Sequence, residues 1–170
     1  MAFDAVVFDL DGTLVEPTSS VNNPVYHSGF PLDSQDYYLK PGVRERIEKL
    51  SVPFAIASNQ TGVQKGLRPM GEAVRAMMFV QEKLLPDCLF AVFAATEDYG
   101  VVVDNFSAGI HQLVIGYGKV NKPNPGLLYY CQEELGQNLL YVGNQDTDRQ
   151  AAMLAGCQYM DINEFLRLKC

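Results

Sequence analysis

The stretch FDLDGT, at residues 8–13, begins at the last residue of the apolar run AFDAVVF, residues 2–8. A short apolar run rich in β-branched residues is typical of a strand buried on both faces of a parallel sheet. Asp9 and Asp11 then follow the carboxyl end of this strand, where ligands bind in open α/β sheets. Because side chains two positions apart on an extended backbone point the same way, both carboxylates can face one small volume. A divalent cation there would relieve their repulsion.

This stretch has two other interpretations, of which the first remains open. The two aspartates can belong to a turn that ends the strand, with one of them capping a following helix. A calcium-binding loop is disfavoured, because the third acidic position of that motif is missing and Gly12 comes too early.

The length and composition of the chain predict one domain spanning residues 1–170. The chain has 170 residues, of which 48% are hydrophobic, enough for one sizeable core. Its formal net charge of −7 disfavours a broad nucleic-acid surface, although a nucleic-acid end remains possible as a partner. Four scattered cysteines without a CxxC pair, and no long apolar segment, predict a cytoplasmic protein that is not bound to a membrane. We expect a monomer or a weak dimer.

The remaining apolar runs alternate with helical patterns. Further strands are predicted at residues 52–58, 88–95, 138–143 and 158–160, and helices around residues 43–50, 74–85, 127–135 and 151–155. This alternation predicts a three-layer, Rossmann-like α/β fold, in which helices cover both faces of a parallel sheet. Residues 15–41 are rich in Pro, Ser and Asn and are predicted to be a long loop, too short for a large cap. Residues 97–120 are predicted to contain a small hairpin.

Polar residues recur at three later points along the chain. Ser58 and Asn59 lie in SNQTG, Lys122 lies in KVNKPNPG, and GNQDTD at residues 143–148 contributes an amide and two carboxylates. Each has a plain explanation, as a turn, a solvated lysine or a helix cap at Asp146. Taken together, a carboxylate nucleophile, a hydroxyl donor, a lysine and a metal site are what phosphoryl transfer requires.

In this order, DLDGT, SNQTG, KPNPG and GNQDTD resemble the four motifs of the haloacid dehalogenase-like (HAD) superfamily, from Phe3 to about Gly156. NQTGVQKG and KPNPG are similar to its histidinol-phosphatase, heptose-bisphosphate phosphatase and polynucleotide 3′-phosphatase branch. The resemblance implies an Mg²⁺-dependent phosphatase with minimal or no cap that works through an aspartyl-phosphate. The expected substrate is a small-molecule or end-group phosphate monoester with room for a bulky leaving group, such as a sugar phosphate, a histidinol phosphate-like ester or a polynucleotide 3′-phosphate.

The resemblance also implies a role for each motif residue. Asp9 is expected to attack phosphorus and to bind Mg²⁺, and Asp11 to act as the general acid and base with its backbone carbonyl on the metal. The remaining expected phosphate contacts are Thr13, Ser58, Asn59 and Lys122. The remaining expected metal ligands are Asn144 and Asp148.

Two cations follow the second motif closely. Lys65 and Arg68 are expected near the mouth of the site, where they would bind a second anionic group of the substrate. The alternative is that both lie at the solvent-exposed start of a helix.

Asn144 departs from the family pattern, which commonly has an aspartate there. An amide oxygen is an acceptable ligand for Mg²⁺, but the loss of a charge predicts weaker metal binding. The alternative function is therefore a catalytically weakened HAD-fold module that binds phosphate or a partner without turnover. A phosphomutase is disfavoured because it would need a closing cap to exclude water.

Overall fold

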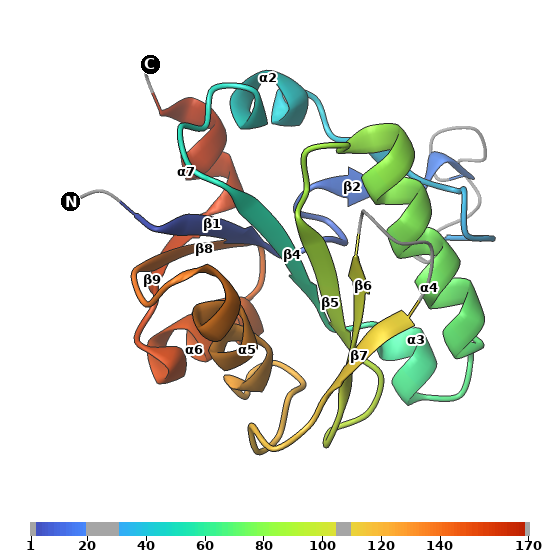
Figure 1. The fold of residues 1–170 in the computed structure, drawn as a ribbon. Helices are drawn as coiled ribbons and strands as arrows, with labels where there is room; N and C mark the ends of the chain where they lie inside the picture. Colours follow the sequence, from blue (N-terminus) through green and yellow to red (C-terminus); the bar gives the residue numbers. More distant parts are fainter. Residues whose placement is uncertain (1–2, 20–30, 105–109, 169–170) are drawn as a thin grey trace.

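The computed structural model describes residues 3–19, 31–104 and 110–168 and contains one seven-stranded sheet (Figure 1). The five strands β5, β4, β1, β8 and β9 are mutually parallel. In spatial order the strands are β7 (Ile110–Val114), β6 (Gly100–Asp104), β5 (Phe90–Ala94), β4 (Phe54–Ser58), β1 (Ala5–Phe8), β8 (Leu139–Gly143) and β9 (Gln158–Asp161).

Strand β1 lies between β4 and β8, with Val7 paired to Ala55 on one side and to Tyr141 on the other. Every residue of these three strands is buried, which explains their continuous apolar sequences. Because the three strands are parallel, their carboxyl ends meet at one edge of the sheet. The residues that follow them are therefore brought together.

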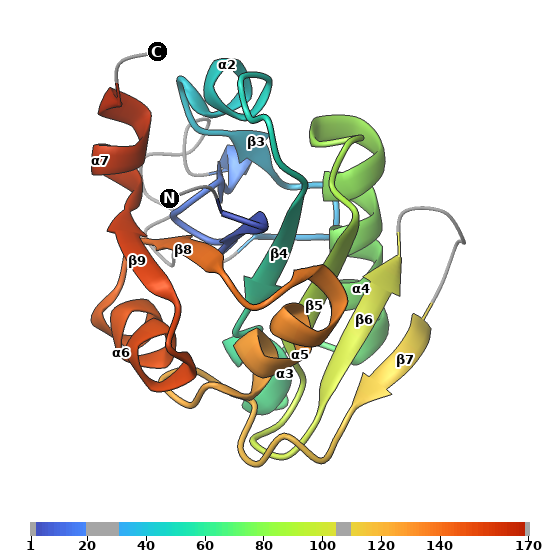
Figure 2. The same cartoon turned by 60° about the vertical axis from the view of Figure 1, so that its left-hand side comes forward.

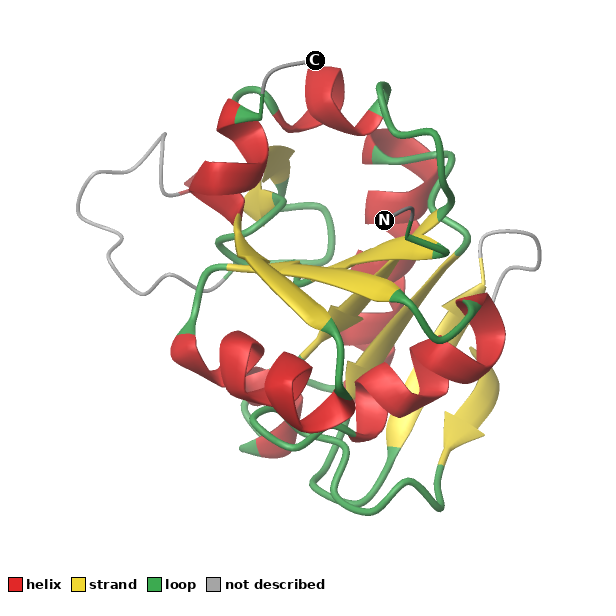
Figure 3. Ribbon diagram, turned by 90° about the vertical axis from the view of Figure 1, so that its left-hand side faces the viewer, coloured by secondary structure: helices red, strands yellow, loops and turns green. Residues whose placement is uncertain are grey.

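Helices cover both faces of the sheet, as the alternating pattern predicts (Figures 2 and 3). They are α2 (Val43–Ile47), α3 (Thr61–Gln64), α4 (Met70–Phe79), α5 (Gly126–Leu135), α6 (Asp146–Ala155) and α7 (Ile162–Arg167), with a π-helical turn, Val80–Leu84, after α4. Buried side chains of α2, α4 and α7 form one apolar cluster with the sheet, and those of α5 and α6 form a second. The three-layer Rossmann-like fold is confirmed.

The sheet is mixed at one edge. The predicted hairpin is present as β6 and β7, and β6 runs antiparallel to β5. The connection at residues 95–99 is too short for a crossover, so the chain can only turn back along the same edge. The predicted parallel sheet is therefore mixed, because the two strands of the hairpin extend its parallel core.

The segment predicted as a long loop begins and ends in a small antiparallel ribbon. Its strands are β2 (Val15–Glu16) and β3 (Tyr38–Leu39). The middle of the segment, residues 20–30, lies outside the described residues. In the part of the chain that the structure describes, no helix has the length and apolar character needed to cross a bilayer.

Candidate active site

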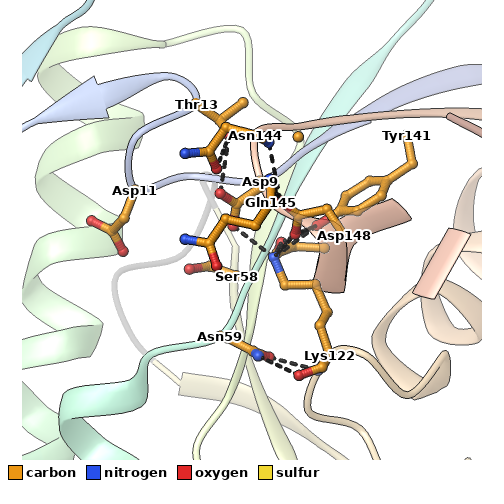
Figure 4. A network of polar contacts seen from close by, with 12 residues as sticks. Asp9, Asp11, Thr13, Ser58, Asn59, Lys122, Tyr141, Asn144, Gln145 and Asp148 are labelled. Atoms are coloured by element: carbon orange, nitrogen blue, oxygen red, sulfur yellow. Dashed lines mark hydrogen bonds and ion pairs between the residues drawn. The ribbon is translucent and has the colours of Figure 1, made fainter. Parts of the chain in front are cut away.

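Three polar residues meet at the carboxyl ends of the central strands (Figure 4). Asp9 follows β1, Ser58 ends β4, and Asn144 follows β8. The backbone N–H of Asp9 donates to the Val142 carbonyl at 2.9 Å, so the pairing of β1 with β8 continues as far as the aspartate. The sheet itself therefore fixes the position of the Asp9 carboxylate.

Asp9 forms a buried ion pair with Lys122. The Lys122 Nζ lies 2.6 Å from Asp9 Oδ1 and 2.7 Å from Asp148 Oδ1, and it also donates to the Tyr141 hydroxyl at 2.9 Å. Burial alone would lower the pKa of Lys122, but the charges of Asp9 and Asp148 outweigh it and the pKa is raised. Burial raises the pKa of Asp9, which Lys122 opposes and Asp148 reinforces. Lys122 thus stays charged between two carboxylates.

The Asp148 carboxylate is already fully engaged. Its Oδ1 accepts from Lys122, and its Oδ2 accepts from the backbone N–H groups of Asn144 and Gln145 at 3.1 and 3.0 Å. The residue lies in the first turn of α6, where Gln145, and not the expected Asp146, is the N-cap. These contacts indicate that Asp148 positions Lys122, and they do not support the expectation that it ligates the metal.

Thr13 connects Asp9 to Asn144. Its hydroxyl oxygen lies 3.0 Å from Asp9 Oδ2 and 3.0 Å from Asn144 Oδ1. Because Thr13 is completely buried, it can orient these two oxygens, and this geometry does not support the expectation of a phosphate contact. Gly12 allows this approach: its φ is +78°, and a Cβ at this position would lie 2.6 Å from Asn144 Nδ2.

The donor atoms here suit Mg²⁺. Asp9 offers a carboxylate oxygen and Asn144 an amide oxygen, both 3.0 Å from the Thr13 hydroxyl, and the expected Asp11 backbone carbonyl would add another neutral oxygen. Hard oxygen ligands are what this cation prefers. Among the described residues no three Asp, Glu, His or Cys side chains gather as a metal site. The candidate set therefore combines one carboxylate with neutral oxygens.

Asp11 lies apart from the Lys122 cluster (Figure 4). Its carboxylate is held by Gln60, a residue that the sequence motifs did not single out. Gln60 Nε2 donates to Asp11 Oδ2 at 3.0 Å and to Ser58 Oγ at 3.1 Å, and the Gln60 side chain is buried. Burial, followed by the charge of Asp9, raises the pKa of Asp11 to about 6. The position of Gln60 in SNQTG, between two candidate residues and a helix start, was the available signal.

The side chain of Asn59 anchors the loop that carries Lys122. Its Nδ2 donates to the Lys122 carbonyl and its Oδ1 accepts from the Lys122 N–H, both at 2.7 Å. Since both ends of the amide are used, this geometry does not support the expectation that the Asn59 side chain binds phosphate. It fixes the position of Lys122 relative to β4.

Two cavities meet at this edge of the sheet. The smaller, of about 240 Å³, is lined by Asp9, Asp11, Ser58 and Lys122 among others, and can accept a phosphoryl group. The larger, of about 860 Å³, adjoins it and shares Asp11 as a wall.

The two cations after the second motif differ in their placement. Arg68 lines the larger cavity, whereas Lys65 is exposed and lines neither cavity. Lys65 directly follows the short helix α3, on its solvent side. The structure therefore brings only Arg68 of this pair to the site.

The chain is similar in sequence to a curated phosphatase. A relative from Mesorhizobium japonicum, D-glycero-beta-D-manno-heptose-1,7-bisphosphate 7-phosphatase, is 26% identical over 158 residues, which are 89% of this chain and 65% of that protein. The chain thus spans just under two thirds of the length of this curated relative.

Two solved structures share the fold. The first, a HAD-like phosphatase from Mesorhizobium loti, has a TM-score of 0.58 at 24% identity, covering 90% of this chain and 68% of its own. The second is D,D-heptose 1,7-bisphosphate phosphatase from B. bronchiseptica, complexed with magnesium and phosphate. It has a TM-score of 0.63 at 19% identity, and the match covers 91% of this chain and 78% of that protein.

The family model described as "Polynucleotide kinase 3 phosphatase" matches residues 4–165, nearly the whole chain. The four motifs that suggested the HAD superfamily all lie within this match. The chain belongs to the polynucleotide kinase 3 phosphatase family of the HAD superfamily.

Proposed function

We propose that this chain is an Mg²⁺-dependent phosphatase that hydrolyses phosphate monoesters through a phosphoryl intermediate on Asp9. The observation that carries the proposal is the buried pair of Asp9 and Lys122, 2.6 Å apart, in the wall of the smaller cavity. An anionic nucleophile reacts with an anionic phosphoryl group only where positive charge offsets their repulsion. Lys122 supplies such a charge next to the nucleophile.

In the first half-reaction an Asp9 carboxylate oxygen forms a bond to phosphorus while the ester P–O bond breaks. Asp11, in its protonated form, gives its proton to the departing alcohol oxygen. The Lys122 ammonium and the Ser58 hydroxyl line the same cavity and hold the phosphoryl oxygens.

In the second half-reaction the ionised Asp11 takes a proton from a water molecule, whose oxygen attacks phosphorus. The bond between Asp9 and phosphorus breaks, and inorganic phosphate leaves. A pKa of about 6 suits a group that both donates and accepts a proton near neutral pH. Gln60 supports the ionised form, because its amide N–H donates to Asp11 Oδ2.

Asp9, Asn144 and the Asp11 carbonyl would hold the Mg²⁺ ion. When bound, it would neutralise charge on the phosphoryl oxygens as a Lewis acid. The charge balance supports this proposal, since the two carboxylates of Asp9 and Asp148 share the one ammonium of Lys122. The heptose-bisphosphate phosphatase of B. bronchiseptica was crystallised with magnesium and phosphate.

We propose a substrate whose leaving group is larger than the phosphoryl group, a small molecule or an end-group phosphate. The larger cavity beside Asp11 offers about 860 Å³ for it. The names of the family and of its curated relative include polynucleotide and heptose-bisphosphate substrates, so both classes belong in a screen. We further propose that residues 1–170 act as one domain in the cytoplasm, as a monomer or weak dimer.

The proposal is tested by measuring phosphate release with and without Mg²⁺ from sugar bisphosphates, aryl phosphates and 3′-phosphorylated oligonucleotides. Acid-quenched protein should carry one phosphoryl group on the peptide that contains Asp9. Asp9→Asn should reduce turnover to below a few per cent while the protein stays folded. Binding of phosphate without any turnover would instead favour the weakened, non-catalytic module.

A further inference from the structure

Arg68 is the cation in the wall of the larger cavity that the proposed chemistry does not use. Its Nη1 donates to the Tyr37 hydroxyl at 3.0 Å and to Gln60 Oε1 at 3.1 Å. Its Nη2 is shielded from solvent and has no hydrogen-bond partner among the described residues. A buried N–H without a partner is unfavourable, so an acceptor that a ligand brings to this guanidinium would remove that penalty.

Arg68 is held in place on its inner side. Gln60, which accepts from Arg68, donates through the other end of its amide to Asp11. Tyr37, the second acceptor, is buried in the core. A guanidinium fixed by two acceptors is pre-organised, so little side-chain entropy is lost when a ligand binds to it.

Three carboxylates line the cavity with Arg68, and each has another partner. The charge of Arg68 lowers the pKa of Asp11, but the Asp11 carboxylate accepts its hydrogen bond from Gln60. The carboxylate of Glu72 also lines the cavity, but it pairs with Arg75. Asp33, the third carboxylate of the wall, is exposed and accepts from the backbone N–H of Gln35 at 2.7 Å. Exposed charges are screened by solvent and salt, whereas a shielded guanidinium is screened much less.

The rim of the cavity is apolar. Leu32 and Leu67 line it and are 65% and 75% exposed, and Pro69 lies beside them. A carbon skeleton can therefore lie along the rim while one of its anionic groups reaches Arg68.

We propose that Arg68 binds a second anionic group, a carboxylate or a phosphate, on the leaving group of the substrate. This inference rests on the proposed function, because it places the scissile phosphate in the smaller cavity and the leaving group in the larger one. Arg68 is then a specificity-determining residue, and the substrate class is the phosphate monoesters that carry a second anion.

Binding of non-hydrolysable phosphonates tests the proposal without turnover. Calorimetry in the presence of Mg²⁺ would compare 4-carbamoylbenzylphosphonate with its anionic counterparts 4-carboxybenzylphosphonate and 1,4-xylylenediphosphonate. The wild type should bind at least one of the two probes that carry a second anion about tenfold or more tightly than the carbamoyl probe, because Arg68 then donates to a charged acceptor. The preferred anionic probe distinguishes a carboxylate from a phosphate.

Two variants assign the preference to Arg68. Arg68→Met should reduce the preference to within about twofold, and Arg68→Lys should retain part of it because the charge remains. Lys65→Met is the matched control, because it removes one charge from the same segment but from outside both cavities. It should retain the wild-type preference.

Three results would overturn the inference. The first is a wild type that shows no preference among the probes or binds none of them measurably. The second is an Arg68→Met variant in which binding of all three probes is weakened equally. The third is a Lys65→Met variant that loses as much of the preference as Arg68→Met does. A protein that shows the preference but hydrolyses no ester would contradict the proposed function and leave the Arg68 site standing. The two proposals can therefore fail separately.

Discussion

Asp11 combines a charge with burial, and this combination has consequences for catalysis and for stability. Its pKa of about 6 arises mainly from burial and then from the charge of Asp9. Gln60 donates to its carboxylate and limits the rise. The same residue that suits proton transfer near neutral pH therefore destabilises the metal-free fold when it ionises.

The role of Asp11 in acid catalysis predicts a dependence on the leaving group. Asp11→Asn should lower turnover by about 10²- to 10⁴-fold for an alkyl phosphate, the usual range for a general acid. The first step should lose much less with a nitrophenyl phosphate, whose leaving oxygen needs no proton. Single-turnover rates for both esters measure this step, and equal losses would contradict the acid role.

A second prediction concerns stability in the absence of metal. The pKa of Asp11 is raised from 3.8 to about 6 on folding, so the folded state binds its proton more tightly than the unfolded state does. The contribution of the residue to stability therefore falls as the pH rises from about 4 to 6 and stays unfavourable above that window.

Asp11→Asn should thus stabilise the metal-free protein at pH 7, by about 1 to 3 kcal/mol at 1.4 kcal/mol per pKa unit. Urea unfolding in EDTA at pH 5 and pH 7 gives the difference between the two proteins. That difference should be smaller at pH 5. A variant that is less stable than the wild type at pH 7 would show that the carboxylate is favourably paired.

At the scale of elements, α7 (Ile162–Arg167) supports the strand that carries Asp9. Phe165 of α7 is buried, and its ring lies 5.2 Å from that of Phe8, edge to face. Phe165→Ala should lower the free energy of unfolding by about 3 to 5 kcal/mol through loss of burial and the cavity left behind. Chemical denaturation measures it. The exposed neighbour Glu164→Ala is the control and should change stability by less than about 0.5 kcal/mol.

The strands and long helices could be predicted from sequence because their apolar patterns reflect burial directly. The runs that became β1, β4 and β8 are buried on both faces, and Gly136 and Gly156 end α5 and α6 where expected. Helix α7 was missed because its apolar stripe spans less than two turns. Its N-cap, Asp161, which accepts from the Asn163 N–H at 2.8 Å, was the available signal.

The residues of the site could be located from sequence, but their contacts could not. The motifs place Asp9, Lys122 and Asp148 at one edge of the sheet, as the structure does. Which oxygen each donor reaches depends on side-chain directions that spacing does not fix. For this reason Asn59 and Thr13 were expected on the phosphate, whereas both contact neighbouring side chains or backbone.

At the scale of the whole molecule, the site stores repulsion that a bound cation would relieve. Two carboxylates, those of Asp9 and Asp148, contact one ammonium at the carboxyl ends of three fully buried strands, and the raised pKa of Asp11 reports the nearby charge of Asp9, in a chain of net charge −7. Because a ligand that binds only the folded state stabilises it, Mg²⁺ should raise the temperature of unfolding. The size of the rise reports metal affinity independently of activity.

Asn144 predicts that this affinity is weak. A neutral amide oxygen replaces an anionic one beside Asp9, and one charge against a dication at contact distance is worth several kcal/mol at an effective dielectric near 20, before desolvation. A net difference of about 1 to 3 kcal/mol corresponds to roughly tenfold or more in affinity. Asn144→Asp should therefore lower the Mg²⁺ concentration at the midpoint of the thermal shift by about tenfold or more.

Asp148→Asn provides the contrast. Because the Asp148 carboxylate accepts from Lys122 and from two backbone N–H groups, its loss should lower turnover and overall stability while it moves the Mg²⁺ midpoint less than Asn144→Asp does. Thermal shift against Mg²⁺ for the three proteins measures both effects. An unchanged midpoint in Asn144→Asp, together with a large shift in Asp148→Asn, would place the metal on Asp148, and Lys122 would then need another partner to hold it beside Asp9.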